Sequence, residues 1–257
     1  MEPSRRSVPR PAVPIAFAHR GASAHAPENT VEAFSLALAL GATGLESDTW
    51  LAADGNPVLV HDRTIRRPGR RMDVTRRTSR ELAEYGVPSL AELYAAVGAA
   101  VELSLDIEHA EVALPAVDVA SLHGAAGHLW ACSPSVDVLR AIRAHSTDVR
   151  VVCSTRPRRL PGGLEPLVPQ LTDLGANALN LHRRDWTPER VRLVHDAGLL
   201  AFGWDAQSAE AVSALVDLGV DAIYSDWPEL MVAAIRARVD SAASPPLDPR
   251  PLPVAGL

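Results

Sequence analysis

Short apolar runs alternate with helical patterns along most of the chain, and this alternation restricts its fold more than any other feature. The runs predict buried strands, and the segments between them, with apolar residues three and four apart, predict amphipathic helices. The expected strands are residues 15–18, 44–48, 101–107, 128–132, 149–153, 178–181, 199–203 and 222–225. Eight strands with interleaved helices predict an α/β fold of the TIM (β/α)₈ barrel type. An open doubly wound sheet has the same periodicity and remains an alternative.

The clearest helical patterns also carry end signals. They cover residues 31–40, 136–144, 189–197 and 209–218. Ser135 and Ser208 precede two of them as N-cap residues, and Gly41 and Gly219 close two. Helices with such ends between short buried strands are typical of repeated βα units.

The expected domain is a barrel over residues 13–238, which suits a chain of 257 residues. It is interrupted by a small polar insertion at about 62–88, after the second strand, that follows a turn at Asp54-Gly55 and an apolar run at 57–60. Loops after barrel strands face the active site, so we expect the insertion to shape the substrate pocket. Residues 239–257 are rich in Pro, Ala and Ser and are expected to be a disordered tail.

Charge and composition narrow the class of partner. A net charge of −6 disfavours a nucleic-acid or anionic-membrane partner, which would need a clustered basic face. All 25 cationic side chains are arginine, so no lysine is present to act as an acid, base or Schiff-base amine. A small-molecule ligand is therefore expected.

The sequence shows no secretory signal and no apolar segment long enough to form a membrane anchor, which predicts a cytoplasmic protein. Cys132 and Cys153 lack metal-ligand spacing and are expected to be buried free thiols. Their position on consecutive strands leaves a disulfide geometrically possible.

Polar side chains gather where the first strands end, which is where barrel enzymes place catalytic groups. They are His19, Arg20, Glu46, Asp48, His61 and Asp106. Glu46 and Asp48 are two residues apart on one strand, so they share a face, and with Asp106 they offer oxygen ligands for Mg²⁺ or Ca²⁺.

The same strand ends carry side chains suited to proton transfer and anion binding. His19 and His61 can accept a proton from the nucleophile and donate one to the leaving oxygen. Arg20 suits a phosphate ligand. The other histidines considered are interpreted as structural: His25, His123, His128, His145 and His195.

The same segments resemble the glycerophosphodiester phosphodiesterase family. The shared motifs are His19-Arg20-Gly21, Pro27-Glu28-Asn29-Thr30, Glu46-x-Asp48 and His61-Asp62, and the similarity extends over roughly residues 13–235. The resemblance implies a TIM barrel, a divalent metal on Glu46, Asp48 and Asp106, and acid–base catalysis by His19 and His61. It also implies Arg20 as a phosphate ligand and Trp204 beside the glycerol or leaving group.

The third strand departs from the family pattern. Glu108 stands where the family has a lysine, which replaces a cation by an anion next to the metal carboxylates. In another register Glu108 would be the metal ligand, but Asp106 is preferred because Leu103, Leu105 and Ile107 then share the opposite face. An arginine at 156, 183 or 184 could replace the lysine, Glu108 could point outward at an arginine, or the site could be impaired.

The expected activity is metal-dependent hydrolysis of glycerophosphodiesters, such as glycerophosphocholine, to an alcohol and glycerol 3-phosphate. Because of Glu108, the alternative is a catalytically impaired barrel that binds a phosphate ligand. A third reading, ranked last, is an intramolecular transphosphorylase acting on choline phospholipids. The sequence leaves the alcohol group and the oligomeric state open.

Overall fold

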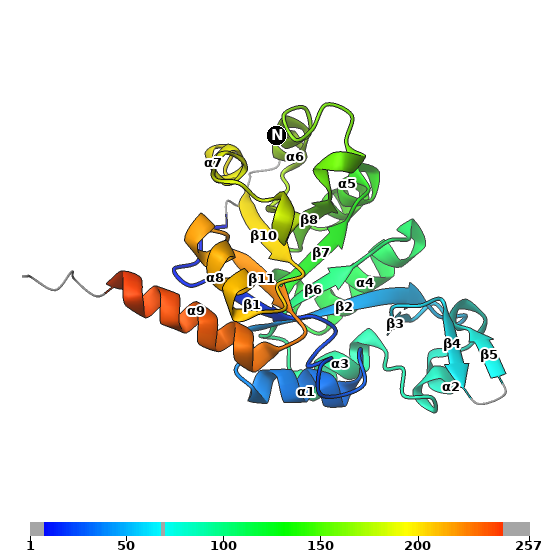
Figure 1. The fold of residues 1–257 in the computed structure, drawn as a ribbon. Helices are drawn as coiled ribbons and strands as arrows, with labels where there is room; N and C mark the ends of the chain where they lie inside the picture. Colours follow the sequence, from blue (N-terminus) through cyan, green and yellow to red (C-terminus); the bar gives the residue numbers. More distant parts are fainter. Residues whose placement is uncertain (1–7, 68–69, 244–257) are drawn as a thin grey trace, which may run out of the picture.

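The chain forms a closed barrel of parallel strands in the computed structural model, which describes residues 8–67 and 70–243 (Figure 1). The eight barrel strands are β1 Ile15–Ala18, β2 Gly44–Leu51, β6 Glu102–Asp106, β7 Leu129–Ser133, β8 Arg150–Thr155, β9 Ala178–His182, β10 Leu200–Trp204 and β11 Ala222–Ser225. They follow each other round the barrel in sequence order, and β1 pairs with both β11 and β2. This last pairing closes the sheet, which confirms the TIM barrel and rules out the open sheet.

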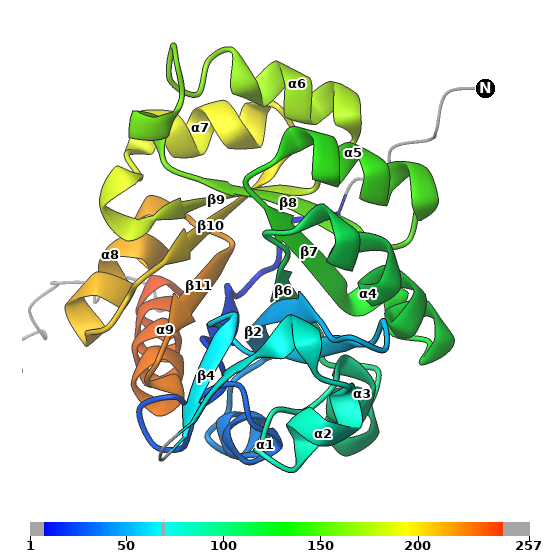
Figure 2. The same ribbon diagram turned by 90° about the vertical axis from the view of Figure 1, so that its right-hand side faces the viewer.

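Helices cover the outside of the strands (Figure 2). They are α1 Val31–Ala39, α3 Leu90–Val97, α4 Ala110–Leu122, α5 Val136–His145, α6 Leu167–Leu174, α7 Pro188–Asp196, α8 Ala209–Leu218 and α9 Pro228–Ala243. Short 3₁₀ turns lie at Val74–Arg76 (η1), Ala126–His128 (η2), Pro157–Arg159 (η3) and Arg183–Asp185 (η4). The expected boundary at residue 238 falls inside α9, and residues 244–257 of the expected tail lie outside the described residues.

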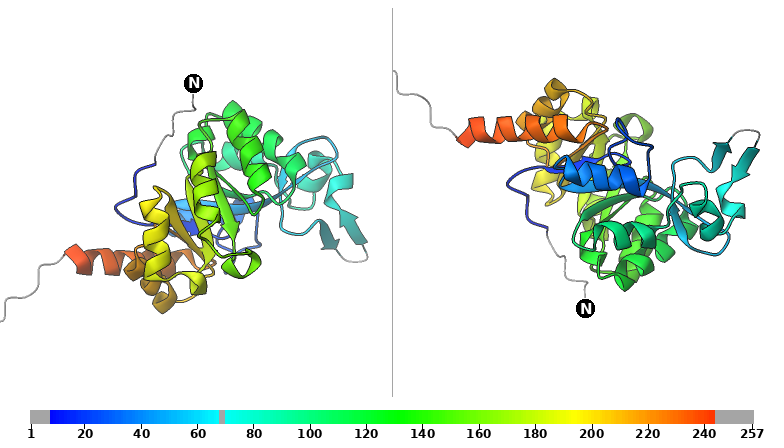
Figure 3. Two further views of the ribbon diagram at one scale, coloured as in Figure 1. Left: turned by 90° about the horizontal axis from the view of Figure 1, so that it is seen from above. Right: turned by 90° about the horizontal axis from the view of Figure 1, so that it is seen from below.

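The insertion begins with an antiparallel extension of the sheet. β2 continues to Leu51 because its last residues pair with β3, Pro57–Leu59, across the turn at Gly55. There follow the hairpin of β4 Thr64–Arg67 and β5 Arg70–Asp73, and the short helix α2 Ser79–Ala83. Figure 3 shows the hairpin projecting from one side of the barrel and the end of α9 from the opposite side.

Alternation along the strands divides the core into two layers. The larger cluster, between strands and helices, contains Leu103, Leu105 and Ile107, which therefore point away from the barrel interior. The interior cluster holds Phe17, Trp130, Cys132, Val152, Ala178, Leu200, Phe202, Ala222 and Tyr224. Such a filled interior leaves the polar chemistry to the strand ends.

The two cysteines are free and lie on opposite faces of the sheet. Cys132 belongs to the interior cluster and Cys153 to the outer one. In the register of β7 and β8, Cys153 is opposite Ser133 rather than Cys132. Side chains on opposite faces cannot form a disulfide, so the expectation of free thiols is confirmed.

Within residues 8–67 and 70–243, no helix combines the length and apolar character needed to cross a membrane.

Candidate active site

Three carboxylates meet where β2 and β6 run side by side. Asp48 and Asp106 are register partners on the two strands, and Glu46 lies two residues before Asp48 on the same face. One carboxylate oxygen of each residue lies within 4.8 Å of the others. The sequence expectation that these residues come together is met, and Asp106 rather than Glu108 completes the cluster.

The electrostatics of the cluster favour a bound cation. Burial raises the pKa of Glu46 to about 8, to which the charges of Asp48 and Asp106 add. Burial also raises the pKa of Asp106 to about 7, with the charge of Asp48 as the next cause. Clustered buried carboxylates hold protons unless a positive charge offsets their repulsion. Glu46, Asp48 and Asp106 are therefore fitted to hold a divalent cation, for which carboxylate oxygens are ordinary ligands.

The turn after β1 braces this cluster through its backbone and its arginine. Arg20 has a positive φ of 55°, and its backbone N–H donates to Oε2 of Glu46 at 2.8 Å. Its Nη1 donates to Glu28 at 2.9 Å, and its Nε lies 3.1 Å from Oδ2 of Asp48. The guanidinium is thus held by two carboxylates at the edge of the cluster.

The Pro-Glu-Asn-Thr segment links this turn to β2 and α1. Asn29 is buried with φ of 57°; its side chain accepts a hydrogen bond from Ser47 and donates one to Asp48. Thr30 caps α1 by accepting from the backbone N–H of Ala33. The motif therefore fixes where the helix begins and how the strand that carries Glu46 and Asp48 is oriented.

His19 lies between the acidic cluster and the end of the last strand. Its Nδ1 is 2.6 Å from Oδ1 of Asp226, and its Nε2 is 3.8 Å from Oε2 of Glu46. Burial of the imidazole opposes its charged form, but Glu46 and the hydrogen bond to Asp226 outweigh this and raise the pKa of His19 to about 9. Asp226 had no role in the sequence interpretation; its signal was an acidic residue directly after the last barrel strand.

His61 lies further out, beyond the end of β3. Its side chain is 48% exposed, and its Nδ1 is 2.9 Å from Asp62. The backbone carbonyl of His61 accepts a hydrogen bond from the indole of Trp50. In the described part of the chain, the side chain of His61 contacts neither His19 nor the three carboxylates by a hydrogen bond or ion pair.

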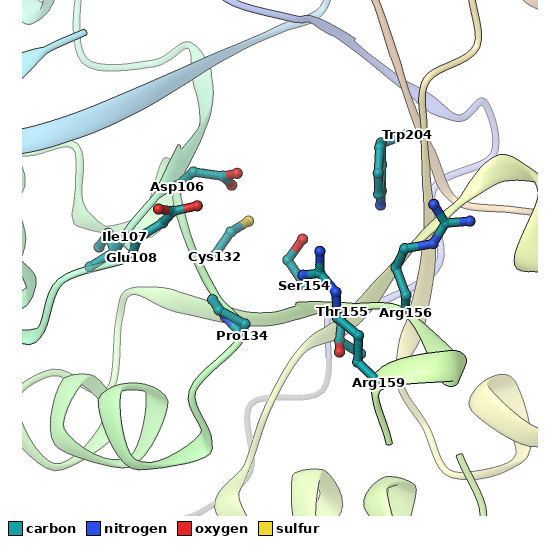
Figure 4. Close-up of a pocket in the computed structure, with 10 residues that line it drawn as sticks. All are labelled: Asp106, Ile107, Glu108, Cys132, Pro134, Ser154, Thr155, Arg156, Arg159 and Trp204. Atoms are coloured by element: carbon teal, nitrogen blue, oxygen red, sulfur yellow. The ribbon is translucent and has the colours of Figure 1, made fainter. Parts of the chain in front are cut away.

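A cavity of about 130 Å³ opens beside the acidic cluster (Figure 4). Asp106 and Glu108 line one wall, Arg156 and Arg159 line another, and Trp204 completes it. Of the three arginines expected as substitutes for a lysine, Arg156 reaches this cavity. Glu108 is directed into the cavity and does not pair with an arginine on the outer surface.

Trp204 is held at the rim by contacts that sequence reasoning missed. The guanidinium carbon of Arg156 lies 5.6 Å from its ring centroid, and His182 meets it edge-on at 4.7 Å. Nε2 of His182 is 3.0 Å from Asp205, which has a positive φ of 69°. Positive φ at a residue other than glycine often marks a functional site, but the sequence alone does not reveal it.

The sequence matches the model of the glycerophosphoryl diester phosphodiesterase family over residues 19–230, a range that contains all the site residues described above. The chain belongs to this family. As a member it is a phosphoric diester hydrolase. The resemblance noted from the motifs is thereby confirmed.

Individual members show the same likeness. The chain is 24% identical to a glycerophosphodiester phosphodiesterase of Caldanaerobacter subterraneus subsp. tengcongensis, over 86% of this chain and 98% of that protein. It is 47% identical to glycerophosphodiester phosphodiesterase 1 of Rattus norvegicus, over 31% of this chain and 26% of that protein.

Solved structures share the barrel. A phosphodiesterase of Oleispira antarctica, in complex with the product sn-glycerol-3-phosphate, has a TM-score of 0.76 at 24% identity and covers 87% of this chain and 97% of its own. A glycerophosphodiester phosphodiesterase of Thermotoga maritima also has a TM-score of 0.76 at 24% identity, with coverage of 86% and 97%. At this identity the family's fold is what these structures have in common with the chain.

Proposed function

We propose that this family member hydrolyses glycerophosphodiesters to an alcohol and glycerol 3-phosphate in a reaction that depends on a divalent metal. The observation that carries the proposal is the meeting of Glu46, Asp48 and Asp106 within 4.8 Å, with the imidazole of His19 3.8 Å from Glu46. The glycerol phosphate found with the Oleispira antarctica enzyme supports the same product class here.

The three carboxylates would hold the metal, Mg²⁺ or Ca²⁺. A bound divalent cation polarises phosphoryl oxygens and stabilises the charge that develops on them. The fit rests on the donor set: three carboxylate oxygens in reach of one point, two of them on carboxyls whose pKa values are raised by burial and mutual repulsion. Cavity and ligand flexibility decide between Mg²⁺ and Ca²⁺.

His19 and His61 would carry the protons. In the metal-free protein the raised pKa of His19 keeps its imidazole protonated near neutral pH. The hydrogen bond to Asp226 favours the same form when Glu46 binds the metal, which suits His19 to donate a proton to the leaving oxygen. Asp226 holds the ring from the side opposite Glu46. His61 would then accept the proton of the attacking hydroxyl or water from its exposed position at the end of β3.

Arg20 and Trp204 would bind the substrate. Arg20 lies against Asp48, so its guanidinium is placed beside any phosphate that approaches the metal carboxylates. Trp204 offers an aromatic face at the cavity rim to the glycerol or the leaving alcohol.

The test is release of glycerol phosphate from glycerophosphocholine and related diesters with Mg²⁺, Ca²⁺ or a chelator. Replacing either catalytic histidine removes a group whose contribution is typically about 10²- to 10⁴-fold, so His19→Ala and His61→Ala should lose most of kcat. His145→Ala is the matched control, since His145 pairs with Asp118 on the outer helices. No turnover with either metal across the diester panel would rule the proposal out.

A second candidate rests on Glu108, whose carboxylate faces the cavity beside Asp106. An anion in place of the family's lysine removes positive charge from the reacting phosphate, so the barrel could still bind a phosphate ligand through its other residues without turning it over. Glu108→Lys separates the two functions. Glycerol phosphate binding without turnover in the wild type, with turnover appearing in Glu108→Lys, would support the impaired site; undiminished wild-type turnover would exclude it.

A further inference from the structure

The cavity beside the acidic cluster has two walls of opposite charge. Asp106 and Glu108 come from the end of β6, and Arg156 and Arg159 come from the turn that follows β8 (Figure 4). The two walls face each other across the cavity, whose volume is about 130 Å³. A substrate phosphate in this cavity therefore meets negative charge on the β6 side and positive charge on the β8 side.

The negative wall cannot bind a phosphate through its own side chains. Glu108 is exposed and forms no hydrogen bond or ion pair with any described residue. Its carboxylate lines the same side of the cavity as that of Asp106. Because this wall carries two carboxylates, a cationic side chain that binds the phosphate has to come from another part of the site.

The two arginines of the positive wall differ in whether a nearby carboxylate pairs with the guanidinium group. Nε of Arg156 donates to Asp185 at 2.9 Å, and its guanidinium lies over Trp204. Arg159 is exposed, and its guanidinium has no carboxylate or carbonyl partner among residues 8–67 and 70–243. Arg159 therefore brings an uncompensated positive charge to the cavity.

The backbone that carries Arg159 forms a hydrogen-bonded 3₁₀ turn. η3 begins at Pro157, whose ring fixes φ, and the N–H of Arg159 donates to the carbonyl of Arg156 at 2.9 Å. The N–H of Leu160 closes the turn on the carbonyl of Pro157 at 3.0 Å. The turn thus directs Arg159 into the cavity, while Arg158, one residue earlier and also exposed, does not line it.

We propose that Arg159 binds the substrate's phosphate together with Arg20, so that the cationic side chain that β6 lacks at position 108 is supplied by the turn after β8. Its guanidinium donates to non-bridging oxygens on the side of the cavity opposite the metal carboxylates. This inference rests on the proposed function for the nature of the ligand. Arg159 would then determine the specificity of the cavity for a phosphate group. Its positive charge would also offset the negative charge of Glu108.

The experiment compares Arg159→Ala and Arg159→Lys with Arg158→Ala, which removes the same charge from the neighbouring position. KM and kcat for glycerophosphocholine are measured beside the Kd for inorganic phosphate in the metal-loaded protein. Arg159→Ala should weaken phosphate binding and raise KM about tenfold to hundredfold, the usual effect of losing a charged hydrogen bond. Arg159→Lys should restore part of the affinity, and Arg158→Ala should match the wild type.

A further arm tests the opposing wall. Glu108→Gln removes the repulsive charge and should tighten phosphate binding, in the wild type and in Arg159→Ala alike. Binding of free glycerol, which carries no charge, should not change in any of these variants, which separates a phosphate contact from an alcohol contact.

The outcomes distinguish this inference from the proposed function. If the wild type turns over no diester but binds phosphate in a manner that needs Arg159, the proposed function fails and the inference stands. If the wild type is active and Arg159→Ala binds phosphate like Arg158→Ala, the inference is overturned while the function stands. A wild type that binds no phosphate overturns it as well.

Discussion

His19 owes its orientation, and after Glu46 part of its raised pKa, to a residue near the other end of the sequence. Asp226 follows β11 and binds Nδ1 of the ring, leaving Nε2 directed at Glu46. A carboxylate in this position both fixes the ring and stabilises its charged form. Asp226 is therefore a positioning residue for the proposed proton donor.

Replacing Asp226 by Asn should separate these effects. The amide can still accept a hydrogen bond, but it carries no charge, so the pKa of His19 in the metal-free protein should fall from about 9 toward its ordinary value. We expect kcat to fall about tenfold or more. As pH is raised, kcat should also begin to decline at a lower pH than in the wild type, because His19 loses its proton earlier. NMR titration of the His19 ring measures the first effect directly.

Asp118→Asn is the matched control for this substitution. Asp118 pairs with His145 at 2.7 Å on the helical exterior, so its loss should leave the titration of His19 and the kcat profile unchanged. An unaltered His19 titration in Asp226→Asn would contradict the role given to Asp226.

At the scale of elements, the β1–α1 connection sets the geometry of the site. Gly21 turns the chain with φ of 80°, between Arg20, whose N–H bonds Glu46, and the first turn of α1. A Cβ on Gly21 would lie 2.7 Å from the carbonyl carbon of Ala33, which is backbone and cannot move aside alone. The close packing of helix on turn therefore requires glycine here.

Gly21→Ala should accordingly destabilise the protein and displace Arg20 from Glu46. We expect about 1 to 3 kcal/mol beyond the cost of the positive φ itself, the usual range for overpacking. Gly175→Ala is the control for that cost, since Gly175 has φ of 75° and its Cβ would meet only Arg143 at 3.9 Å. Urea unfolding of both variants gives the difference; equal losses would show that the packing at Gly21 is not limiting.

In the insertion, pairing between two strands makes one of them longer than the sequence pattern predicted. The sequence predicted a second strand ending at Asp48, but β2 runs to Leu51 because β3 folds back against it. The insertion and the strand ends that lead into it have a small hydrophobic core of their own, formed by Ala52, Val58, Val74, Leu82 and Val87. His61 follows β3, so the position of a proposed catalytic residue depends on this local pairing.

At the scale of the whole molecule, folding brings together three groups that hold protons more tightly than in the unfolded chain. The pKa is raised from 4.5 to about 8 in Glu46, from 3.8 to about 7 in Asp106 and from 6.5 to about 9 in His19. Between the ordinary and the raised values the native state binds more protons than the unfolded state. The free energy of unfolding then decreases as pH rises.

The metal-free protein should therefore lose stability as pH rises from about 5 to about 9. All three shifts have the same sign, so their contributions are present at acid pH and are lost as each group deprotonates in the native state. Thermal unfolding with a chelator at a series of pH values measures the trend. A Tm that rises over this range would contradict it.

Mg²⁺ or Ca²⁺ should reverse the trend, because protons compete with the metal for the carboxylates. The increase in Tm on adding metal should be larger at pH 8 than at pH 6. Asp106→Asn removes one of the three carboxylates and should abolish most of the response.

The sequence by itself determined the alternation of strands and helices and the face on which the acidic residues lie, and it favoured the barrel without excluding an open doubly wound sheet. These follow from local periodicity: alternation along β6 places Leu103 and Leu105 outward and Asp106 toward the strand ends. The motif around Asn29 is equally local, since its partners Ser47 and Asp48 lie on the next strand of the same βα unit.

Only the tertiary structure decided what the closed barrel brings together. The contact of His19 with Asp226 joins residues 207 positions apart, and it exists because β1 pairs with β11. The facing of Glu108 and Arg159 across one cavity depends likewise on how β6, β7 and β8 follow each other round the barrel. Periodicity fixes the face of a side chain, but neighbours across a barrel are set by hydrogen bonds between distant strands, which no local pattern records.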